Sequence, residues 1–297
     1  MHNGSVMLSL IDIIRRESNP LAPLPTDIDA QLRVLPGIKC VVFDVYGTLM
    51  VSGVGDISHS SVDDRKQAIF KLFEQMGIPL KQELAEPGVE LNAIIQAHQD
   101  RSRQTGIAYP EVDIREVWED FVKEYTDLAT TTHDLIAELA VRFELSVNPT
   151  WPMPHLESTL ETLREKGIRL GIVSNAQFFT PLLFDAYCQQ PFDSLGFESD
   201  LCQWSYHFRE AKPSMRMYRI EAMTLEAKYG ILEDEVLYVG NDLLNDIVPA
   251  SKVGFKTALF AGDKRSLRLR EGDERVHGIT PDLMVTSLDQ LIACVGA

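Results

Sequence analysis

Four short apolar runs, separated by segments with helical spacing, constrain the fold of this chain more than any other feature. They are residues 38–43 (IKCVVF), 168–173 (IRLGIV), 236–239 (VLYV) and 257–260 (TALF). Short, continuous apolar runs are typical of parallel strands that are buried on both faces of a sheet. Between and around them, periodic apolar positions predict crossover helices at 155–166, 178–187, 213–229 and 243–252. The alternation of strand and helix predicts an α/β fold with a doubly wound parallel sheet.

A block of helical sequence interrupts this alternation after the first apolar run. Apolar residues recur with helical spacing at 61–77, 82–104 and 113–143, so residues 61–150 read as all-helical. Residues 6–16 have the same spacing ahead of the first strand. The sequence therefore predicts a helical insertion in an otherwise regular α/β sheet.

Polar and charged residues follow the apolar runs, where active sites of doubly wound sheets lie. Each has an ordinary structural explanation, because Asp, Ser and Asn commonly shape turns and cap helices, and Lys-Pro also occurs in plain loops. As an ordered set at one rim of the sheet, however, they indicate a functional site. The set is Asp44, Tyr46, Gly47 and Thr48 after the first run, Ser174 and Asn175 after the second, then Lys212, and finally Asn241, Asp242 and Asp246.

This ordered set resembles the haloacid-dehalogenase-like superfamily, whose pattern is DxxGT, then Ser or Thr, then Lys, then an acidic motif. The match runs from about Ile38 to Phe260. The resemblance implies a Rossmann-like catalytic core made of residues 1–60 and 153–297. It also implies an all-helical cap domain, residues 61–152, inserted between the first and second motifs; residues 109–114 (YPEVDI) look like cap sequence.

The resemblance also implies roles for the rim residues. Asp44 is expected to attack the substrate and form a covalent intermediate, which divides one difficult step into two easier ones. Lys212 is expected to balance the negative charge. Tyr46 is the third expected catalytic residue; it lies two residues after Asp44, and its phenol can donate a proton but is a poor base at neutral pH. The expected substrate-binding residues, which offer hydroxyl or backbone N–H donors, are Gly47, Thr48, Ser174 and Asn175. The expected oxygen ligands of a Mg²⁺ cofactor are Asp44, the carbonyl of Tyr46, Asp242 and Asp246.

Two features leave the chemistry open between phosphatase and dehalogenase. Phosphatases of the superfamily carry an Asp where this chain has Tyr46, whereas Tyr is typical of its metal-free haloacid dehalogenases. Those dehalogenases, however, have Ser and Asn in the acidic motif and an early cap arginine. Here the motif contains Asp242, and Arg65 sits beside Asp63 and Asp64 as expected of a surface ion pair. We favour Mg²⁺-dependent hydrolysis of a small phosphorylated metabolite; the alternatives are a metal-free 2-haloacid dehalogenase and a non-catalytic binding protein of the same fold.

Composition narrows the range of partners. The formal net charge of −16 disfavours nucleic acid. The most basic stretch, residues 264–270, is followed at once by acidic residues, so we expect a self-paired surface segment. No apolar run approaches the roughly 20 residues that span a bilayer, and the N-terminus does not resemble a signal peptide. A small-molecule substrate and a cytoplasmic location, without membrane association, are therefore expected; oligomeric state stays open.

Overall fold

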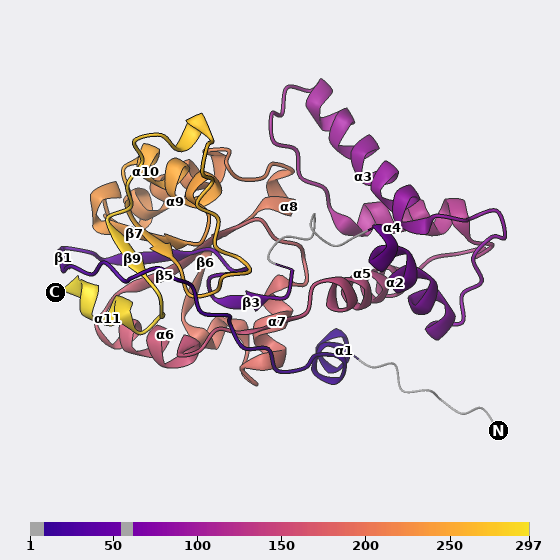
Figure 1. Ribbon diagram of the computed structural model, residues 1–297, viewed down its shortest axis with the longest axis horizontal. Helices are drawn as coiled ribbons and strands as arrows, with labels where there is room; N and C mark the ends of the chain where they lie inside the picture. The colour runs from indigo at the N-terminus through magenta and orange to yellow at the C-terminus, as the bar shows by residue number, and fades with distance from the viewer. Residues whose placement is uncertain (1–8, 55–61, 297) are drawn as a thin grey trace.

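The computed structural model of the chain describes residues 9–54 and 62–296. Its centre is a six-stranded, all-parallel sheet with the strand order β6-β5-β2-β7-β8-β9 (Figure 1). The strands are β2 (Cys40–Phe43), β5 (Arg169–Ser174), β6 (Phe197–Trp204), β7 (Val236–Gly240), β8 (Lys256–Phe260) and β9 (Leu283–Val285). The four apolar runs correspond to β2, β5, β7 and β8, so the predicted parallel sheet is confirmed.

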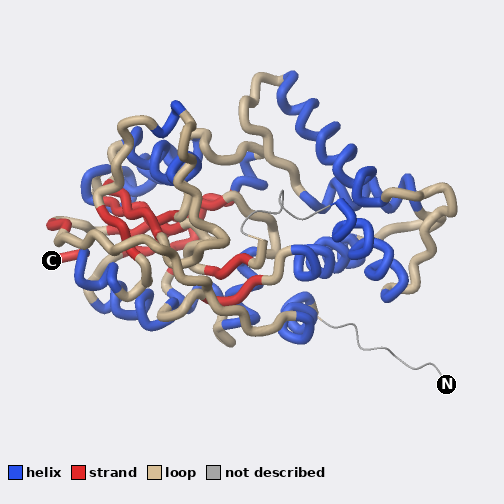
Figure 2. The backbone as a smooth tube through the Cα atoms, in the orientation of Figure 1, coloured by secondary structure: helices blue, strands red, loops and turns tan. Residues whose placement is uncertain are grey.

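Helices cover both faces of this sheet, as a doubly wound fold requires (Figures 1 and 2). On one face lie α1 (Leu10–Glu17), α6 (Leu156–Glu165), α7 (Thr180–Tyr187) and α11 (Gln290–Cys294). On the other face lie α9 (Arg216–Thr224) and α10 (Val248–Val253). Alternate residues of β2 divide between the two cores: Val41 and Phe43 join the first, Cys40 and Val42 the second. This division explains why the strand is apolar throughout.

The inserted helices pack on one another around a separate hydrophobic cluster. They are α2 (Val62–Gln75), α3 (Pro87–Gln104), α4 (Ile114–Tyr125) and α5 (His133–Val147). The cluster has an aromatic centre in which Trp118 contacts Phe73, Phe121 and Phe143. A short antiparallel pair, β3 (Met50–Ser52) and β4 (Thr150–Pro152), lies where the chain leaves the core and returns to it. The cap limits at 61 and 152 stay a prediction, and residue 61 lies outside the described residues.

Several of the expected helices differ in detail. The one expected at 82–104 begins at Pro87, and the one expected at 213–229 is divided into α9 and the π-helical turn η3 (Leu225–Tyr229). The segment 113–143 forms two helices instead of one, because α4 ends at Tyr125 and Thr132 caps the start of α5 by accepting a bond from the Leu135 N–H (3.2 Å). The segment 243–252 begins with a π-helical turn, η5 (Leu243–Ile247), which α10 continues. Such turns are rare and often occur at functional sites.

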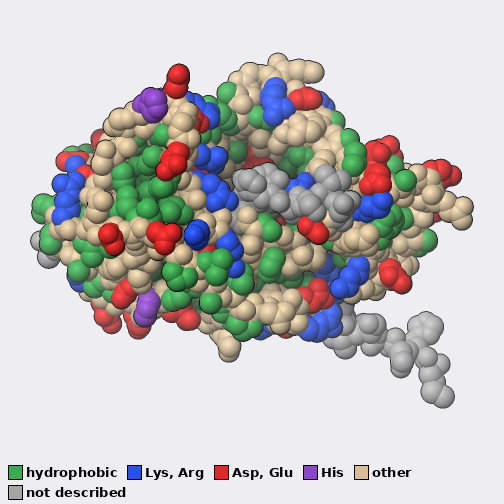
Figure 3. Space-filling view, in the orientation of Figure 1, with side chains coloured by type: hydrophobic (Ala, Val, Ile, Leu, Met, Phe, Trp, Pro, Cys, Tyr) green, Lys and Arg blue, Asp and Glu red, His purple; other side chains and the backbone are tan. Residues whose placement is uncertain are grey.

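Smaller elements complete the chain. They are the parallel pair β1 (Leu35–Pro36) and β10 (Val295–Gly296), α8 (Ser205–Phe208), the π-helical turn η3 (Leu225–Tyr229), and the 3₁₀ turns η2 (Phe192–Leu195), η4 (Glu233–Glu235) and η6 (Glu274–Val276). On the face shown in Figure 3, Asp and Glu side chains are scattered and not gathered into one patch. Within the described part of the chain, no helix combines the length and apolarity needed to cross a membrane.

Glu221 on α9 is a buried carboxyl that makes the stability of the fold depend on pH. Its side chain is 0% exposed; one oxygen accepts a hydrogen bond from Gln203 Nε2 (3.0 Å), and the other has no partner among the described residues. Burial raises the pKa of Glu221 well above its usual value, although the Gln203 bond opposes this. The folded state therefore holds a proton that the unfolded chain releases near pH ~4.3.

We expect this proton to make the stability of the native protein fall as pH rises from about 4.3 toward the raised pKa of Glu221. The loss is at most about 1.4 kcal/mol per pH unit, the slope for one proton. Glu221→Gln keeps the Gln203 contact without the titrating group, so its free energy of unfolding should fall less over this range. Urea unfolding of both proteins between about pH 6 and about pH 8 measures the difference. Parallel pH dependences would show that Glu221 is ionised in the fold.

Candidate functional site

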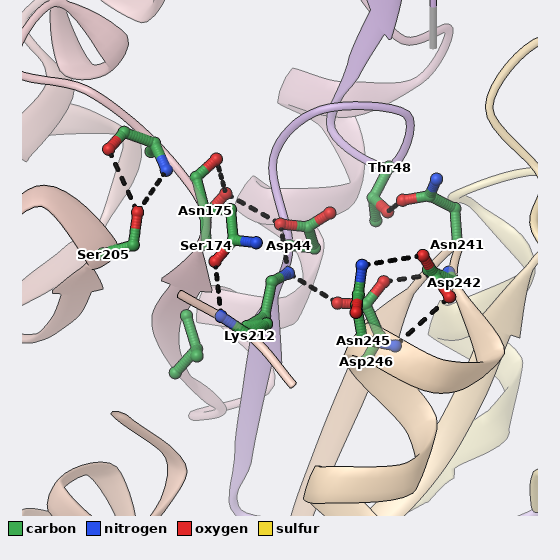
Figure 4. Close-up of polar contacts among 12 residues, drawn as sticks. Asp44, Thr48, Ser174, Asn175, Ser205, Lys212, Asn241, Asp242, Asn245 and Asp246 are labelled. Atoms are coloured by element: carbon green, nitrogen blue, oxygen red, sulfur yellow. Dashed lines mark hydrogen bonds and ion pairs between the residues drawn. The ribbon is translucent and has the colours of Figure 1, made fainter. Parts of the chain in front are cut away.

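The site lies at the switch point of the sheet, where β2 pairs with β5 on one side and β7 on the other. Phe43 of β2 lies opposite Ile172 of β5 and Val239 of β7. The chain therefore continues at one rim into Asp44 from β2, Ser174 from β5 and Asn241 from β7 (Figure 4). Ligands in doubly wound sheets bind at this point, because helices leave the strand ends in opposite directions and open a crevice.

Asp44 is held at the centre of the rim by donors on one of its two oxygens. Ser174 Oγ donates to Asp44 Oδ1 at 2.7 Å, and Lys212 Nζ donates to the same atom at 2.8 Å (Figure 4). The Asp44 N–H donates to the Val239 carbonyl at 2.9 Å, which fixes the backbone. Oδ2 accepts no hydrogen bond from any described residue. One carboxylate oxygen is thus anchored and the other is available for reaction.

Lys212 connects Asp44 to a second carboxylate. Its Nζ lies 2.5 Å from Asp246 Oδ1, and the lysine side chain is 3% exposed. Burial alone lowers the pKa of the Lys212 ammonium, but the carboxylates of Asp246 and Asp44 reverse this effect and raise the pKa above its ordinary value. The Lys212 N–H donates to Asn175 Oδ1 at 2.7 Å, so Asn175 positions the lysine. A fixed ammonium ion at this place can neutralise charge that develops on a bound anion.

Asp246 is deeper in the site than its neighbours. Its Oδ2 accepts a bond from the Asp242 N–H (2.9 Å), and its Oδ1 lies 3.1 Å from the Tyr238 hydroxyl. Burial raises the pKa of Asp246, and Lys212 opposes the rise. Tyr238 is a site residue that the sequence analysis missed, because it lies inside the apolar run of β7. Both oxygens of Asp246 are therefore already engaged within the protein.

Asp242 is bonded to the start of its helix and to an arginine. Its Oδ1 accepts bonds from the N–H groups of Leu244 (2.9 Å) and Asn245 (3.2 Å), so it caps the π turn. Arg270 donates to it twice: Nε to Oδ1 at 3.0 Å, and Nη2 to Oδ2. Arg270 belongs to the basic stretch for which we predicted pairing with its acidic neighbours. Its ion pair with Asp242 differs from that expectation.

The residues after Asp44 mainly support the loop. Gly47 has φ +84°, and a Cβ there would lie 2.5 Å from Ser266 Cβ, so no other residue fits. The Gly47 N–H donates to the Met50 carbonyl (2.7 Å), and Thr48 Oγ1 donates to Asn241 Oδ1 (3.1 Å). These donors, which we expected to bind substrate, are satisfied by the protein.

Tyr46 presents a neutral phenol. Its hydroxyl lies 3.0 Å from Thr180 Oγ1 at the start of α7. Burial raises the pKa of Tyr46 well above its ordinary value, and the charge of Glu144 raises it further. A phenol that is neutral across the physiological range cannot act as a general base there.

A cavity of about 300 Å³ opens over Asp44. Most of the residues that line it are polar or charged; the apolar ones are Ala176 and Phe179, and Tyr46 is aromatic with a hydroxyl group. The rim of the sheet contributes Asp44, Asn175, Gln177, Lys212, Asn241, Asp242, Asn245 and Asp246. The inserted helices and their connections to the core contribute Ser52, Glu111, Glu144 and Asn148, and the loop after β8 contributes Arg268 and Arg270. Thr48 and Ser174 do not line it.

The described residues include no group of three or more His, Cys, Asp or Glu side chains placed to hold a metal ion. Of the carboxylates we expected to bind Mg²⁺, Asp44 and Asp246 meet at Lys212, whereas Asp242 binds Arg270. Asp44 alone among the three has a carboxylate oxygen without a hydrogen-bond donor.

Comparison with known proteins agrees with this architecture. Residues 38–254 match the model of a hydrolase family, the haloacid dehalogenase-like hydrolases. A ribulose-1,5-bisphosphate 5-phosphatase from Halopiger xanaduensis (strain DSM 18323 / JCM 14033 / SH-6) is 26% identical over 141 residues, covering 47% of this chain and 54% of that protein, about half of each. The crystal structure of a 2-haloacid dehalogenase from Pseudomonas syringae pv. Tomato DC3000 is 17% identical, covering 86% of this chain and 97% of that one with a TM-score of 0.54. This last likeness shows a common fold.

Proposed function

Since the chain belongs to the haloacid dehalogenase-like hydrolases, we propose that it hydrolyses the phosphate monoester of a small, hydroxylated metabolite. The polar lining of the cavity carries this proposal. Among the described residues, Glu144 Oε2 accepts no hydrogen bond and Asn175 Nδ2 donates none. A hydroxylated phosphate can pair with both groups, and the short alkyl body of a haloacid cannot. The partial similarity to a phosphatase supports the same choice.

In this proposal Asp44 Oδ2 attacks the phosphorus atom and the ester oxygen leaves, giving an aspartyl phosphate that water then hydrolyses. Ser174 and Lys212 hold Oδ1, so the attacking oxygen is oriented before the substrate arrives. Lys212 also compensates the charge of the phosphoryl group. Asn175 lines the cavity beside Lys212 and offers its amide N–H₂ group to a phosphoryl oxygen.

A 2-haloacid dehalogenase is the second candidate, and Tyr46 is the observation that favours it. The two chemistries share Asp44 but release different products. We would therefore assay phosphate release from a set of sugar and polyol phosphates, and halide release from 2-haloacids, each with and without Mg²⁺. Phosphate release alone is the expected result. Halide release without phosphate release would contradict our proposal and indicate a dehalogenase. Release of neither product would indicate a non-catalytic binding protein.

Mg²⁺ is the cofactor we propose, and the site fits it in part. Asp44 Oδ2 and the Tyr46 carbonyl are oxygen donors of the kind Mg²⁺ prefers. Asp242 and Asp246 have the right chemistry, but their oxygens are occupied by Arg270, Lys212 and backbone N–H groups. When bound, the ion supplies positive charge that lets an anionic nucleophile approach an anionic phosphate.

Arg270→Ala should strengthen Mg²⁺ binding if Asp242 is a ligand, because the change removes the arginine that is paired with both oxygens of that carboxylate. We expect an increase in affinity of about tenfold or more, equivalent to about 1.4 kcal/mol, in calorimetric titrations with Mg²⁺ alone. Arg268→Ala is the matched control: it removes one positive charge from the same cavity, but Arg268 bonds to backbone carbonyls and not to Asp242. Equal affinities of the two variants would exclude Asp242 as a ligand.

A further inference from the structure

We propose that Glu144, near the end of α5, is the acid and base that position 46 does not supply. It protonates the ester oxygen of the leaving group, and later accepts a proton from the water that hydrolyses the aspartyl phosphate. This inference rests on the proposed phosphatase function. It adds a catalytic residue from outside the ordered set of rim residues that the sequence predicts.

Glu144 occupies the wall of the same cavity as Asp44 and Tyr46, although 100 residues separate it from the nucleophile in the sequence. The residue is 8% exposed. Its Oε1 accepts a hydrogen bond from Asn148 Nδ2 at 3.0 Å, and Asn148 Oδ1 accepts one from Ser52 Oγ at 2.7 Å. Ser52 ends β3, the strand that follows the Asp44 loop. The carboxyl is thus fixed to the segment that carries the nucleophile.

One oxygen of Glu144 is left for a ligand. Oε2 accepts no hydrogen bond from any described residue. Glu111, another carboxyl on the cavity wall, differs: its two oxygens accept bonds from Ser205 Oγ and the Val112 N–H, both at 2.9 Å. Glu221 also has an unpaired oxygen, but it lines no described cavity; the unpaired oxygen of Glu144 belongs to a residue of the cavity wall over Asp44.

Glu144 shares its cavity with Asp44, above which the leaving group has to be protonated, and with Tyr46. After burial, its charge is the strongest influence that raises the pKa of the Tyr46 phenol, and the charge of Asp44 acts on the same phenol. Asp44, Tyr46 and Glu144 all line one cavity, and Tyr46 occupies the sequence position where phosphatases of this superfamily carry their acid. A leaving group bound above Asp44 points into the cavity that Glu144 lines.

The protonation of Glu144 suits both halves of the reaction. Burial raises the pKa of Glu144 to about 7, while the Asn148 bond and the charge of Arg65 on α2 oppose the rise. Burial keeps the phenol of Tyr46, which lines the same cavity, neutral by raising its pKa well above the ordinary value. Near neutral pH the acid and the base form are both populated, which is the optimum for general acid–base catalysis.

Asp44 Oδ2 forms a bond to phosphorus, the bond from phosphorus to the ester oxygen breaks, and the departing oxygen takes the Glu144 proton. A water molecule then gives a proton to the Glu144 carboxylate and bonds to phosphorus, while the bond to Asp44 breaks. The products are an alcohol and inorganic phosphate, and Glu144 is protonated again.

The test compares two substrates that differ in their need for an acid. Glycerol phosphate has a poor leaving group, whereas p-nitrophenyl phosphate releases a phenolate that needs no proton. Glu144→Gln preserves size and one hydrogen-bonding oxygen. With glycerol phosphate we expect the turnover of this variant to fall by about 10²–10⁴-fold. With p-nitrophenyl phosphate it should still release a rapid burst of about one nitrophenolate per enzyme, followed by slow turnover, because only hydrolysis of the aspartyl phosphate needs the base.

Glu221→Gln is the matched control, because it makes the same change at a buried glutamate that lines no described cavity; it should keep wild-type rates on both substrates. Wild-type turnover of glycerol phosphate by Glu144→Gln would overturn the inference. So would equal losses on both substrates with no burst, the result expected of a residue that only supports the structure. If the wild-type protein releases phosphate neither from these two compounds nor from the sugar and polyol phosphates, the proposed function itself is wrong, and the role of Glu144 that rests on it is wrong as well.

Discussion

Asp44→Asn is expected to lower the turnover number by at least about 10⁴-fold, a loss of the size seen when a nucleophile is removed. The amide has the shape of the carboxylate and can still accept the Ser174 hydrogen bond at its oxygen. It lacks the anionic oxygen that attacks the substrate. Steady-state phosphate release by purified wild-type and variant proteins gives the ratio directly.

Asp200→Asn is the control for this comparison. Asp200 is also an aspartate paired with a lysine, since its Oδ2 lies 2.7 Å from Lys228 Nζ, but it lies on the surface and outside the cavity. That variant should retain wild-type turnover. If Asp44→Asn turned over substrate within about tenfold of the wild-type rate, a nucleophilic role for Asp44 would be excluded, because one order of magnitude is only about 1.4 kcal/mol of activation free energy.

Lys212→Met is expected to lower the free energy of unfolding by about 3–5 kcal/mol, the usual result of removing one partner from a buried ion pair. Methionine fills much of the volume of the lysine but leaves Asp44 and Asp246 facing each other without a cation. Urea unfolding near neutral pH measures the change, provided that the unfolding slopes of the two proteins agree. We expect the same variant to lose activity.

The pair between Lys228 and Asp200 again provides the control. The Lys228 side chain is 58% exposed, so Lys228→Met should change stability by about 0–1 kcal/mol, the range measured for surface pairs. If Lys212→Met were as stable as Lys228→Met, the two carboxylates would have to take up a proton or move apart when the ammonium is lost. A rise in the stability difference with pH would indicate protonation.

The sequence predicts the rim of the site well, because parallel strands carry their carboxyl-terminal residues to the same edge. Asp44 and Ser174 could be placed together once two apolar runs had been identified as neighbouring strands. Their contact at 2.7 Å follows from that register. Lys212 could be assigned only through the resemblance to a known superfamily, since no strand ends immediately before it.

The remaining parts of the site depend on contacts between segments that are distant in sequence. Arg270 reaches Asp242 across 28 residues, and Glu144 enters the cavity from the inserted helices. A helical pattern shows that Glu144 lies on a helix but not which cavity its side chain faces. The sequence analysis also missed the edge strand β6. Its buried residues are separated by polar ones, so they do not form a continuous apolar run.

Trapping the covalent intermediate is the most direct test of Asp44 as the nucleophile. The protein would be mixed with a phosphate monoester that it hydrolyses, quenched in acid within one turnover, digested, and examined by tandem mass spectrometry. We expect a phosphoryl group on Asp44 in the wild-type protein and none in Asp44→Asn. A phosphoryl group on another residue, or phosphate release without any protein-bound phosphoryl group under these conditions, would contradict this role.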